Sequence, residues 1–295
     1  MVWQSEPPFA AEALTLPAFD LPAAACDAHA HVFGPAARYP CVPEARYSHP
    51  AHSGPENYAR VRQRLRTPRA VLVQPSYYRF DNRCLLDALC TDTTNLRGVA
   101  MIDPEGRLPE LADWHRRGVR GLRVDLFREQ ALGRSLAQVS AALAKLADLA
   151  AAQGWSVDLY APGMLVAALV DHLAALPSPV SIAHLGYFHP DTDEAALFDA
   201  FVERAARSRN LWIKLTGSYR LASPAAQHRV DDMARTLVAA MPERLLWGSD
   251  WPHVLADPTD TGVLLARMDV WCADVRLRNR ILAENPSRLY WAAET

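Results

Sequence analysis

Two histidines, His29 and His31, lie one residue apart within a short apolar stretch near the start of the chain. Alternate residues of a β-strand face the same side, so both imidazoles would point in one direction. One strand histidine is commonly just a hydrogen-bonded core residue, whereas two on one face indicate a functional site. Imidazoles in such a pair can polarise a carbonyl group or ligate a divalent ion.

Further polar residues occur where later apolar stretches end. Asp250 has a carboxylate suited to general-base catalysis, although its position after Gly-Ser also fits a turn. His184 fits either a site residue or a buried, hydrogen-bonded imidazole. Arg123 lies inside an apolar stretch, where an unpaired charge is costly. An anionic ligand is favoured over Asp125 as the partner of Arg123.

Eight short apolar stretches alternate with helical patterns, and these elements would position the polar residues. The predicted strands are Cys26–Phe33, Arg69–Ser76, Leu96–Ile102, Val119–Leu126, Ser156–Ala161, Pro179–Leu185, Leu211–Thr216 and Arg244–Asp250. The predicted helices are Glu56–Arg66, Asn82–Cys90, Leu108–Arg117, Ser135–Gln153, Met164–Ala175, Asp193–Arg207, Ala225–Ala240 and Thr261–Trp271. Eight such units predict an α/β fold, a (β/α)8 TIM barrel, with functional residues at the carboxyl ends of the strands. A doubly wound open sheet is the rival fold, but the chain has no GxGxxG or P-loop motif.

The expected domain organisation is one barrel domain over residues 26–295, preceded by an irregular N-terminal arm over residues 1–25. A C-terminal helical extension follows the eighth unit. It is predicted as a helix over Val275–Glu284 and a second helix that restarts at Asn285-Pro286, because Asn suits the cap and Pro the first turn.

Composition excludes several classes of protein. The 295 residues are 50% hydrophobic and 22% charged, which is typical of a globular protein, and the net charge of −2 argues against a nucleic-acid binder. No stretch reaches 18 apolar residues, so no membrane span and no membrane partner are expected. Five cysteines without a CxxC pair fit a reducing cytoplasm. Association into a homo-oligomer is left open.

Together, several motifs resemble the amidohydrolase superfamily, of the amidohydrolase 2 type. The motifs are His29-Ala-His31, Ala183-His184-Leu-Gly186, Lys214-Leu-Thr-Gly-Ser-Tyr-Arg220, Gly248-Ser-Asp-Trp-Pro252 and Asn285-Pro-Ser-Arg-Leu-Tyr290. Within that superfamily they are similar to the branch that contains 2-pyrone-4,6-dicarboxylate lactonase and sugar lactonases. The resemblance extends from about Ala25 to Tyr290.

The resemblance raises the question of a metal, since superfamily members usually hold one or two divalent ions. Their strand-four ligand is a lysine or glutamate and their strand-five ligand a histidine, whereas this chain has Arg123 and Tyr160 there. A guanidinium cannot ligate a cation, so a two-metal site is not expected. We expect no cofactor. The alternative is one zinc or manganese ion on His29, His31, His184 and Asp250.

The resemblance also implies a reaction, the hydrolysis of a small anionic lactone such as 2-pyrone-4,6-dicarboxylate. Asp250 would activate water, and His29, His31 and His184 would polarise the carbonyl. The residues expected to bind the substrate are Tyr47, Ser76, Arg123, Arg128, Tyr160 and Arg220, with Arg134 as the alternative to Arg128. Arg123 and Arg220 would clamp carboxylates, and neither has an obvious acidic partner at its own strand end.

Three other functions are considered. The first is a metal-dependent decarboxylase or hydratase of the same superfamily, and the second is a sugar-acid lactonase. The third is a non-catalytic barrel that binds a dicarboxylate or serves in assembly. Retention of the histidine pair, His184 and Asp250 together argues against the third function.

Overall fold

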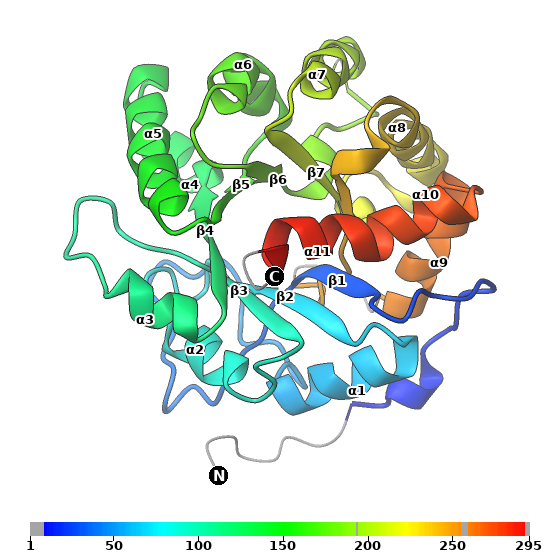
Figure 1. The fold of residues 1–295 in the computed structure, drawn as a ribbon, viewed down its shortest axis with the longest axis horizontal. Coiled ribbons are helices and arrows are strands. Elements are labelled where there is room, and N and C mark those ends of the chain that lie inside the picture. The colour runs from blue at the N-terminus through cyan, green and yellow to red at the C-terminus, as the bar shows by residue number, and fades with distance from the viewer. Residues whose placement is uncertain (1–8, 193, 255–258, 293–295) are drawn as a thin grey trace.

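The computed structural model describes residues 9–192, 194–254 and 259–292 (Figure 1). Eight parallel strands pair in the order of the sequence, from β1 to β8. They are β1 Cys26–Ala30, β2 Arg69–Val73, β3 Leu96–Ala100, β4 Val119–Asp125, β5 Ser156–Tyr160, β6 Val180–Ile182, β7 Leu211–Leu215 and β8 Leu245–Trp247. The segment after β8 closes the ring, because Ala30 and Trp251 form a parallel bridge and the Asp250 amide donates to the His29 carbonyl. The predicted (β/α)8 TIM barrel is therefore confirmed.

Helices surround the barrel, as Figure 1 shows. They are α1 Pro55–Leu65, α2 Arg83–Leu89, α3 Leu111–Arg116, α4 Leu126–Ala131, α5 Leu136–Ala152, α6 Gly163–Ala174, α7 Ala195–Arg207, α8 Gln227–Ala240 and α9 Thr261–Trp271. Each predicted helix is found within a few residues of its expected bounds, although Asp193 lies outside the described residues. The short α4 was not predicted. It begins directly after β4, where the Asp125 side chain accepts from the Arg128 amide and caps it.

The strands are apolar along their length because both of their faces are buried. Helices cover the outer face of the barrel, and side chains fill its interior. Leu122, Val157 and Leu159 are fully buried, and Trp155 anchors the start of β5. This packing makes the barrel a rigid support, so side chains at the strand ends are held in fixed positions.

The C-terminal extension differs from its prediction. Helix α10 (Val275–Asn279), a π-helical turn (Arg280–Glu284) and α11 (Asn285–Tyr290) follow one another without a break. Asn285 has helical φ and ψ of −61° and −51°, so it is not a helix cap and the predicted restart is wrong. Its side chain instead donates to the carbonyls of Pro242 and Leu245, at the start of β8. Those buried carbonyls need donors, and this requirement outweighs the local capping preference.

Helix α11 lies across the end of the barrel at which the strands begin, as the red helix in Figure 1. Ser287 of this helix accepts from Arg69, and Tyr290 and Trp291 pack with Cys26 and other residues at that end. The extension therefore closes the end of the barrel opposite to the strand ends that carry the candidate site.

The N-terminal arm contains a short 3-10 turn at Ala11–Ala13, and Ala11 and Leu14 are buried in the main core. Thr15 bonds to Asp260 through its amide and its hydroxyl, which fastens the arm to the N-terminus of α9. All five cysteines are free thiols. Within the described ranges, no helix combines the length and the apolar character needed to cross a membrane.

Candidate active site

The three histidines and Asp250 meet at the carboxyl end of the barrel. The ring of His29 lies 5.0 Å from that of His31 and 5.3 Å from that of His184, measured between centroids. Asp250 Oδ1 lies 3.8 Å from His29 Nε2 and 3.4 Å from His31 Nε2. All four side chains are buried. The structure thus brings together the four residues that the sequence singled out as catalytic candidates.

The backbone that presents these groups is strained. His184 and Asp250 have positive φ angles of 55° and 61°, which non-glycine residues seldom adopt. Two glycines make room beside the histidines. A Cβ at Gly217 would lie 2.3 Å from His184 Nδ1, and a Cβ at Gly248 would lie 2.6 Å from His29 Cβ. Strain and close approach of this kind typically occur at functional sites.

Asp27, which the sequence did not single out, fixes the segment that carries Asp250. Its carboxylate accepts from the Ser249 amide at 2.8 Å, from the Ser249 hydroxyl and from the Tyr58 hydroxyl at 2.8 Å, and from the His29 amide at 3.2 Å. Burial raises the pKa of Asp27, although these hydrogen bonds oppose the shift. One side chain therefore links the first strand, which carries His29, to the segment after the eighth strand.

The carboxylate of Asp250 is held ionised. Oδ2 accepts from Arg220 Nε and from the Tyr219 hydroxyl, both at 2.6 Å. Burial alone would raise the pKa of Asp250, but Arg220 and His184 outweigh it and hold the pKa well below its usual range. Asp250 is therefore an anion at neutral pH, with Oδ1 facing the histidines.

The imidazoles of His29 and His184 are held neutral. Burial lowers the pKa of His184 to about 4, with Asp250 opposing the shift. Burial, followed by the charge of Lys214, lowers the pKa of His29 well below its usual value. Neutral imidazoles can donate or accept a hydrogen bond according to which nitrogen carries the proton.

The partners of Arg220 differ from those that the sequence predicted. Arg220 was expected to lack an acidic partner, but its Nε bonds Asp250 and its Nη2 bonds the Val254 carbonyl. The sequence could not show this pairing, because the two residues follow neighbouring strands of the closed barrel and lie 30 residues apart. One edge of the guanidinium is committed to Asp250, so Arg220 acts on the carboxylate as well as facing the pocket.

Arg123 is a buried cation at the carboxyl end of the barrel, and its role in binding substrate stays a prediction. Its side chain is buried, Nη1 donates to the Gln74 carbonyl at 2.7 Å, and its guanidinium carbon lies 5.2 Å from the centre of the Tyr160 ring. Among the described residues, no carboxylate oxygen lies close enough to Arg123, within 4.0 Å, to form an ion pair. Asp125 turns away and pairs with Arg46 at 3.2 Å. The Nε of Arg123 is buried without a hydrogen-bond partner, so this cation remains available to an anion.

A small pocket of about 80 Å³ lies against His31, His184 and Asp250, and His29 is not among its lining residues. Its lining includes His31, Tyr47, Ser76, Arg123, Tyr160, His184, Arg220 and Asp250. The expected substrate-binding residues Tyr47, Ser76 and Tyr160 are therefore all at this pocket. Arg128 and Arg134 do not line it.

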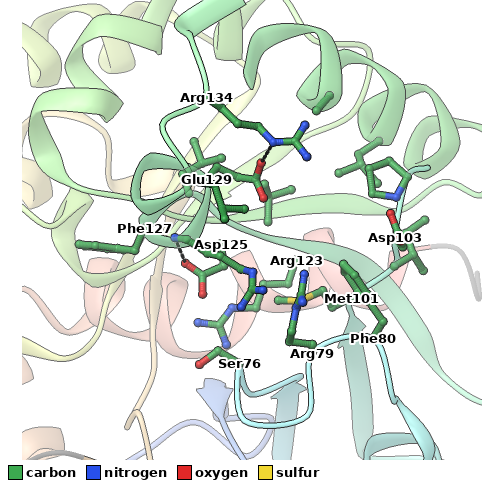
Figure 2. Close-up of a pocket in the computed structure, with 18 of the residues that line it drawn as sticks. Ser76, Arg79, Phe80, Met101, Asp103, Arg123, Asp125, Phe127, Glu129 and Arg134 are labelled. Atoms are coloured by element: carbon green, nitrogen blue, oxygen red, sulfur yellow. Dashed lines mark hydrogen bonds and ion pairs between the residues drawn. The ribbon is translucent and has the colours of Figure 1, made fainter. Parts of the chain in front are cut away.

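Arg128 and Arg134 line a larger neighbouring cavity of about 430 Å³, which shares Ser76 and Arg123 with the small pocket (Figure 2). Arg128 lies 3.8 Å from Glu44, and Figure 2 shows Arg134 paired with Glu129, at 2.7 Å. Each of these arginines has an acidic neighbour, unlike Arg123. The choice between them as a second substrate arginine stays a prediction.

A buried ion pair lies inside the barrel next to the histidines. Lys214 Nζ lies 2.5 Å from Asp158 Oδ2, and both side chains are fully buried. Lys214 Nζ also lies 3.3 Å from His29 Nδ1. The sequence interpretation missed this pair. The available signal was the one used for Arg123, namely a charged residue inside an apolar strand.

His29, His31 and Asp250 offer ligand atoms that all lie within 4.8 Å of one another, so their spacing would admit a single metal ion. His184 is not part of that group. The surroundings fit a dication poorly, because Arg220 occupies the other oxygen of Asp250 and Lys214 contacts His29.

Comparisons with known proteins agree with the fold. The chain is 34% identical to 2-pyrone-4,6-dicarboxylate hydrolase of Comamonas testosteroni, covering 94% of this chain and 93% of the relative. It is 32% identical to 4-sulfomuconolactone hydrolase of Hydrogenophaga intermedia, covering 92% and 90%. A solved structure from Pseudomonas putida, described as a 2-pyrone-4,6-dicarboxylic acid hydrolase, superposes with a TM-score of 0.79 at 29% identity, covering 92% and 98%.

The amidohydrolase family model matches residues 26–291, which is nearly the whole barrel and its extension. Eight parallel strands, His29 on β1 with His31 directly after it, and Asp250 after β8 stand at the positions that the resemblance required. The chain therefore belongs to the amidohydrolase family.

Proposed function

We propose that the protein hydrolyses the lactone ring of a small carboxylated lactone, such as 2-pyrone-4,6-dicarboxylate. The observation that carries the proposal is the ionised carboxylate of Asp250, which faces the imidazoles of His29 and His31 close to the unpaired cation of Arg123. The names of the two curated relatives, both lactone hydrolases, support the same reaction class.

The reaction begins when Asp250 Oδ1 accepts a proton from water, whose oxygen attacks the lactone carbonyl carbon. The carbonyl oxygen becomes an oxyanion, and ring N–H groups of His29 and His184 donate hydrogen bonds to that charge. Collapse of the tetrahedral intermediate breaks the ring C–O bond. The ring oxygen leaves and takes up a proton, which yields the open-chain acid.

The low pKa of Asp250 makes its carboxylate a weak base, which restricts the substrate. A weak base is adequate when the carbonyl is strongly electrophilic and the leaving group is good. An enol released from a pyrone leaves far more readily than an ordinary alcohol. The electrostatics of Asp250 therefore favour an activated lactone over an unactivated one.

Arg123 selects the charge of the substrate. A guanidinium binds a carboxylate through two parallel hydrogen bonds, and this one has no acidic partner among the described residues. Tyr160 packs against it and Ser76 lies at the same pocket wall. A carboxylate attached to the lactone ring would satisfy the buried cation.

We also infer that the reaction needs no metal or other cofactor. The inference rests on the residues that surround the site, since Arg123 and Tyr160 stand where a two-metal site would need ligands and Arg220 holds Asp250. Turnover is expected to survive prolonged dialysis against a chelator. Loss of turnover that added zinc or manganese restores would replace this mechanism by the single-metal alternative.

The function is tested by incubating the purified protein with a panel of lactones and following ring opening by absorbance. The panel contains 2-pyrone-4,6-dicarboxylate, its methyl esters and a neutral sugar lactone, with the Asp250→Asn variant as the matched control. The proposal is supported if the protein opens the ring of the dicarboxylate but not that of its methyl esters or of the sugar lactone. Equal turnover of the neutral sugar lactone, or release of carbon dioxide from an unsaturated dicarboxylate, would overturn it.

The proposal includes the cytoplasm as the place of action, which the five free thiols support. The partner of the protein is its small anionic substrate.

A further inference from the structure

Lys214 lies beneath the histidine pair, on the side of His29 that faces away from Asp250. We propose that Lys214, held by Asp158, is a positioning residue that keeps His29 in the tautomer with its proton on Nε2. His29 is then a hydrogen-bond donor to the substrate oxygen and cannot ligate a metal through that nitrogen. The role in donating to substrate rests on the proposed function, whereas the tautomer does not.

The first step concerns the charge of Lys214. Asp158 Oδ2 lies 2.5 Å from its Nζ and also accepts from the Ser181 hydroxyl at 3.0 Å. Both members of the pair are fully buried. Although burial opposes both shifts, the ion pair lowers the pKa of Asp158 and raises the pKa of Lys214. Lys214 is therefore an ammonium group, which has three N–H donors and no lone pair.

The second step follows from the contact between Lys214 and His29. Nζ lies 3.3 Å from Nδ1, and an ammonium group can only donate, so Nδ1 must accept through its lone pair. An imidazole always carries at least one ring proton. That proton is then on Nε2, whatever the pKa of the ring.

The third step concerns where this proton points. His29 Nε2 faces Asp250 Oδ1 at 3.8 Å, which is beyond hydrogen-bond range, and it is buried with no hydrogen-bond partner. A buried N–H without a partner is costly in a resting protein. Here the free donor points toward Asp250, beneath the wall of the small pocket, which His29 itself does not line. A carbonyl oxygen of the substrate that reached Asp250 would satisfy it.

His31, the first residue after β1, shows the opposite arrangement. Its Nδ1 lies 2.7 Å from the Val73 carbonyl oxygen, which can only accept, so His31 carries a proton on Nδ1. When this ring is neutral, its Nε2 has a lone pair facing Asp250. Two histidines with similar positions therefore have different hydrogen-bonding roles, set by Lys214 in one case and by a backbone carbonyl in the other.

The difference bears on metal binding. A metal ligand must present a lone pair, which a backbone carbonyl on the far nitrogen secures for His31. The ammonium on the far nitrogen of His29 has the reverse effect, and its positive charge also repels a dication. Lys214 thus explains why a His-His-Asp group with suitable spacing is not a ready metal site.

The direct test is nitrogen NMR of the substrate-free protein labelled with ¹⁵N-histidine, with His29→Gln used to assign the signals. We expect the His29 signals to show a protonated Nε2 and an unprotonated Nδ1, and the His31 signals to show a protonated Nδ1. A proton on Nδ1 of His29 would overturn the proposal. Because no substrate is present, the result stands or falls independently of lactone hydrolysis.

A variant test measures what Lys214 does. Lys214→Met alone would leave Asp158 as a buried unpaired charge, so the double variant Lys214→Met/Asp158→Asn removes both charges together. Without the ammonium, His29 is free to move its proton to Nδ1, and affinity for Zn²⁺ or Co²⁺ should rise at least about tenfold over wild type. Binding is measured by calorimetry and by cobalt absorbance.

The same double variant should lose kcat for the lactone with little change in KM, because the donor to the developing oxyanion is lost whereas Arg123 still binds the carboxylate. Wild-type protein that binds zinc tightly, with loss of that binding in His29→Gln, would overturn the proposal. Unchanged metal affinity together with an unchanged His29 tautomer in the double variant would also overturn it.

Discussion

Arg220 and Asp250 form an ion pair in which Nε lies 2.6 Å from Oδ2, so the two oxygens of the Asp250 carboxylate have different neighbours. Oδ2 is bound by Arg220 and Tyr219, whereas Oδ1 faces His29 and His31. The arginine thus orients the proposed base and keeps it ionised. The cost is a low basicity at the oxygen that must accept a proton.

Asp250→Asn should abolish most of kcat while the substrate still binds. An amide cannot accept the proton from water, and general-base catalysis typically contributes about 10² to 10⁴ in rate. Asparagine tolerates the φ of 61° at this position, so the fold should be kept. Steady-state kinetics and calorimetric binding of the dicarboxylate measure the two effects. A variant with near-normal kcat would remove Asp250 from the role of base.

Arg220→Met should reduce kcat and shift the acid limb of the rate profile to higher pH. Arg220 lowers the pKa of Asp250, so its removal lets that pKa rise and leaves less of the carboxylate ionised at a given acidic pH. Tyr219→Phe, which removes one uncharged donor from the same oxygen, is the matched control and should shift the limb less. A rise in KM without movement of the limb would show that Arg220 acts only on the substrate.

Arg123→Met should raise KM for a dicarboxylate and lower kcat/KM by about 2–4 kcal/mol, the range for a buried charged pair that loses one partner. Esterification of the substrate carboxylate should cause a similar loss in wild type and little further loss in the variant. Arg79→Met is the control, since Arg79 lines only the larger cavity. Equal turnover of a neutral lactone by wild type and Arg123→Met would contradict the role of Arg123.

His253→Asn should make stability less sensitive to acid. Burial lowers the pKa of His253 from 6.5 to about 4, so between these values the unfolded chain binds a proton that the folded chain does not. The neutral ring contributes about 3 kcal/mol to the free energy of unfolding above pH 6.5, and this contribution is lost as the pH falls through 4. Urea unfolding at several pH values in this window should show a smaller slope in the variant. An unchanged slope would contradict the neutral state of His253.

The sequence alone determined the number and order of the strand–helix units, because buried parallel strands and amphipathic helices have local periodicities. It also placed His29 and His31 on one face and brought Asp250, His184 and Arg123 to one end of the barrel, since parallel strands share a direction. These conclusions needed no knowledge of which side chains touch.

Only the tertiary structure decided the partners of the charged groups. Lys214 on β7, Asp158 on β5 and His29 on β1 meet because alternate strands supply the side chains of one layer inside a barrel. Which residues share a layer depends on the stagger of the closed sheet, and no local pattern in the sequence contains that stagger. For the same reason the pairing of Arg220 with Asp250, and with it the low basicity of the proposed base, became visible only in the folded chain.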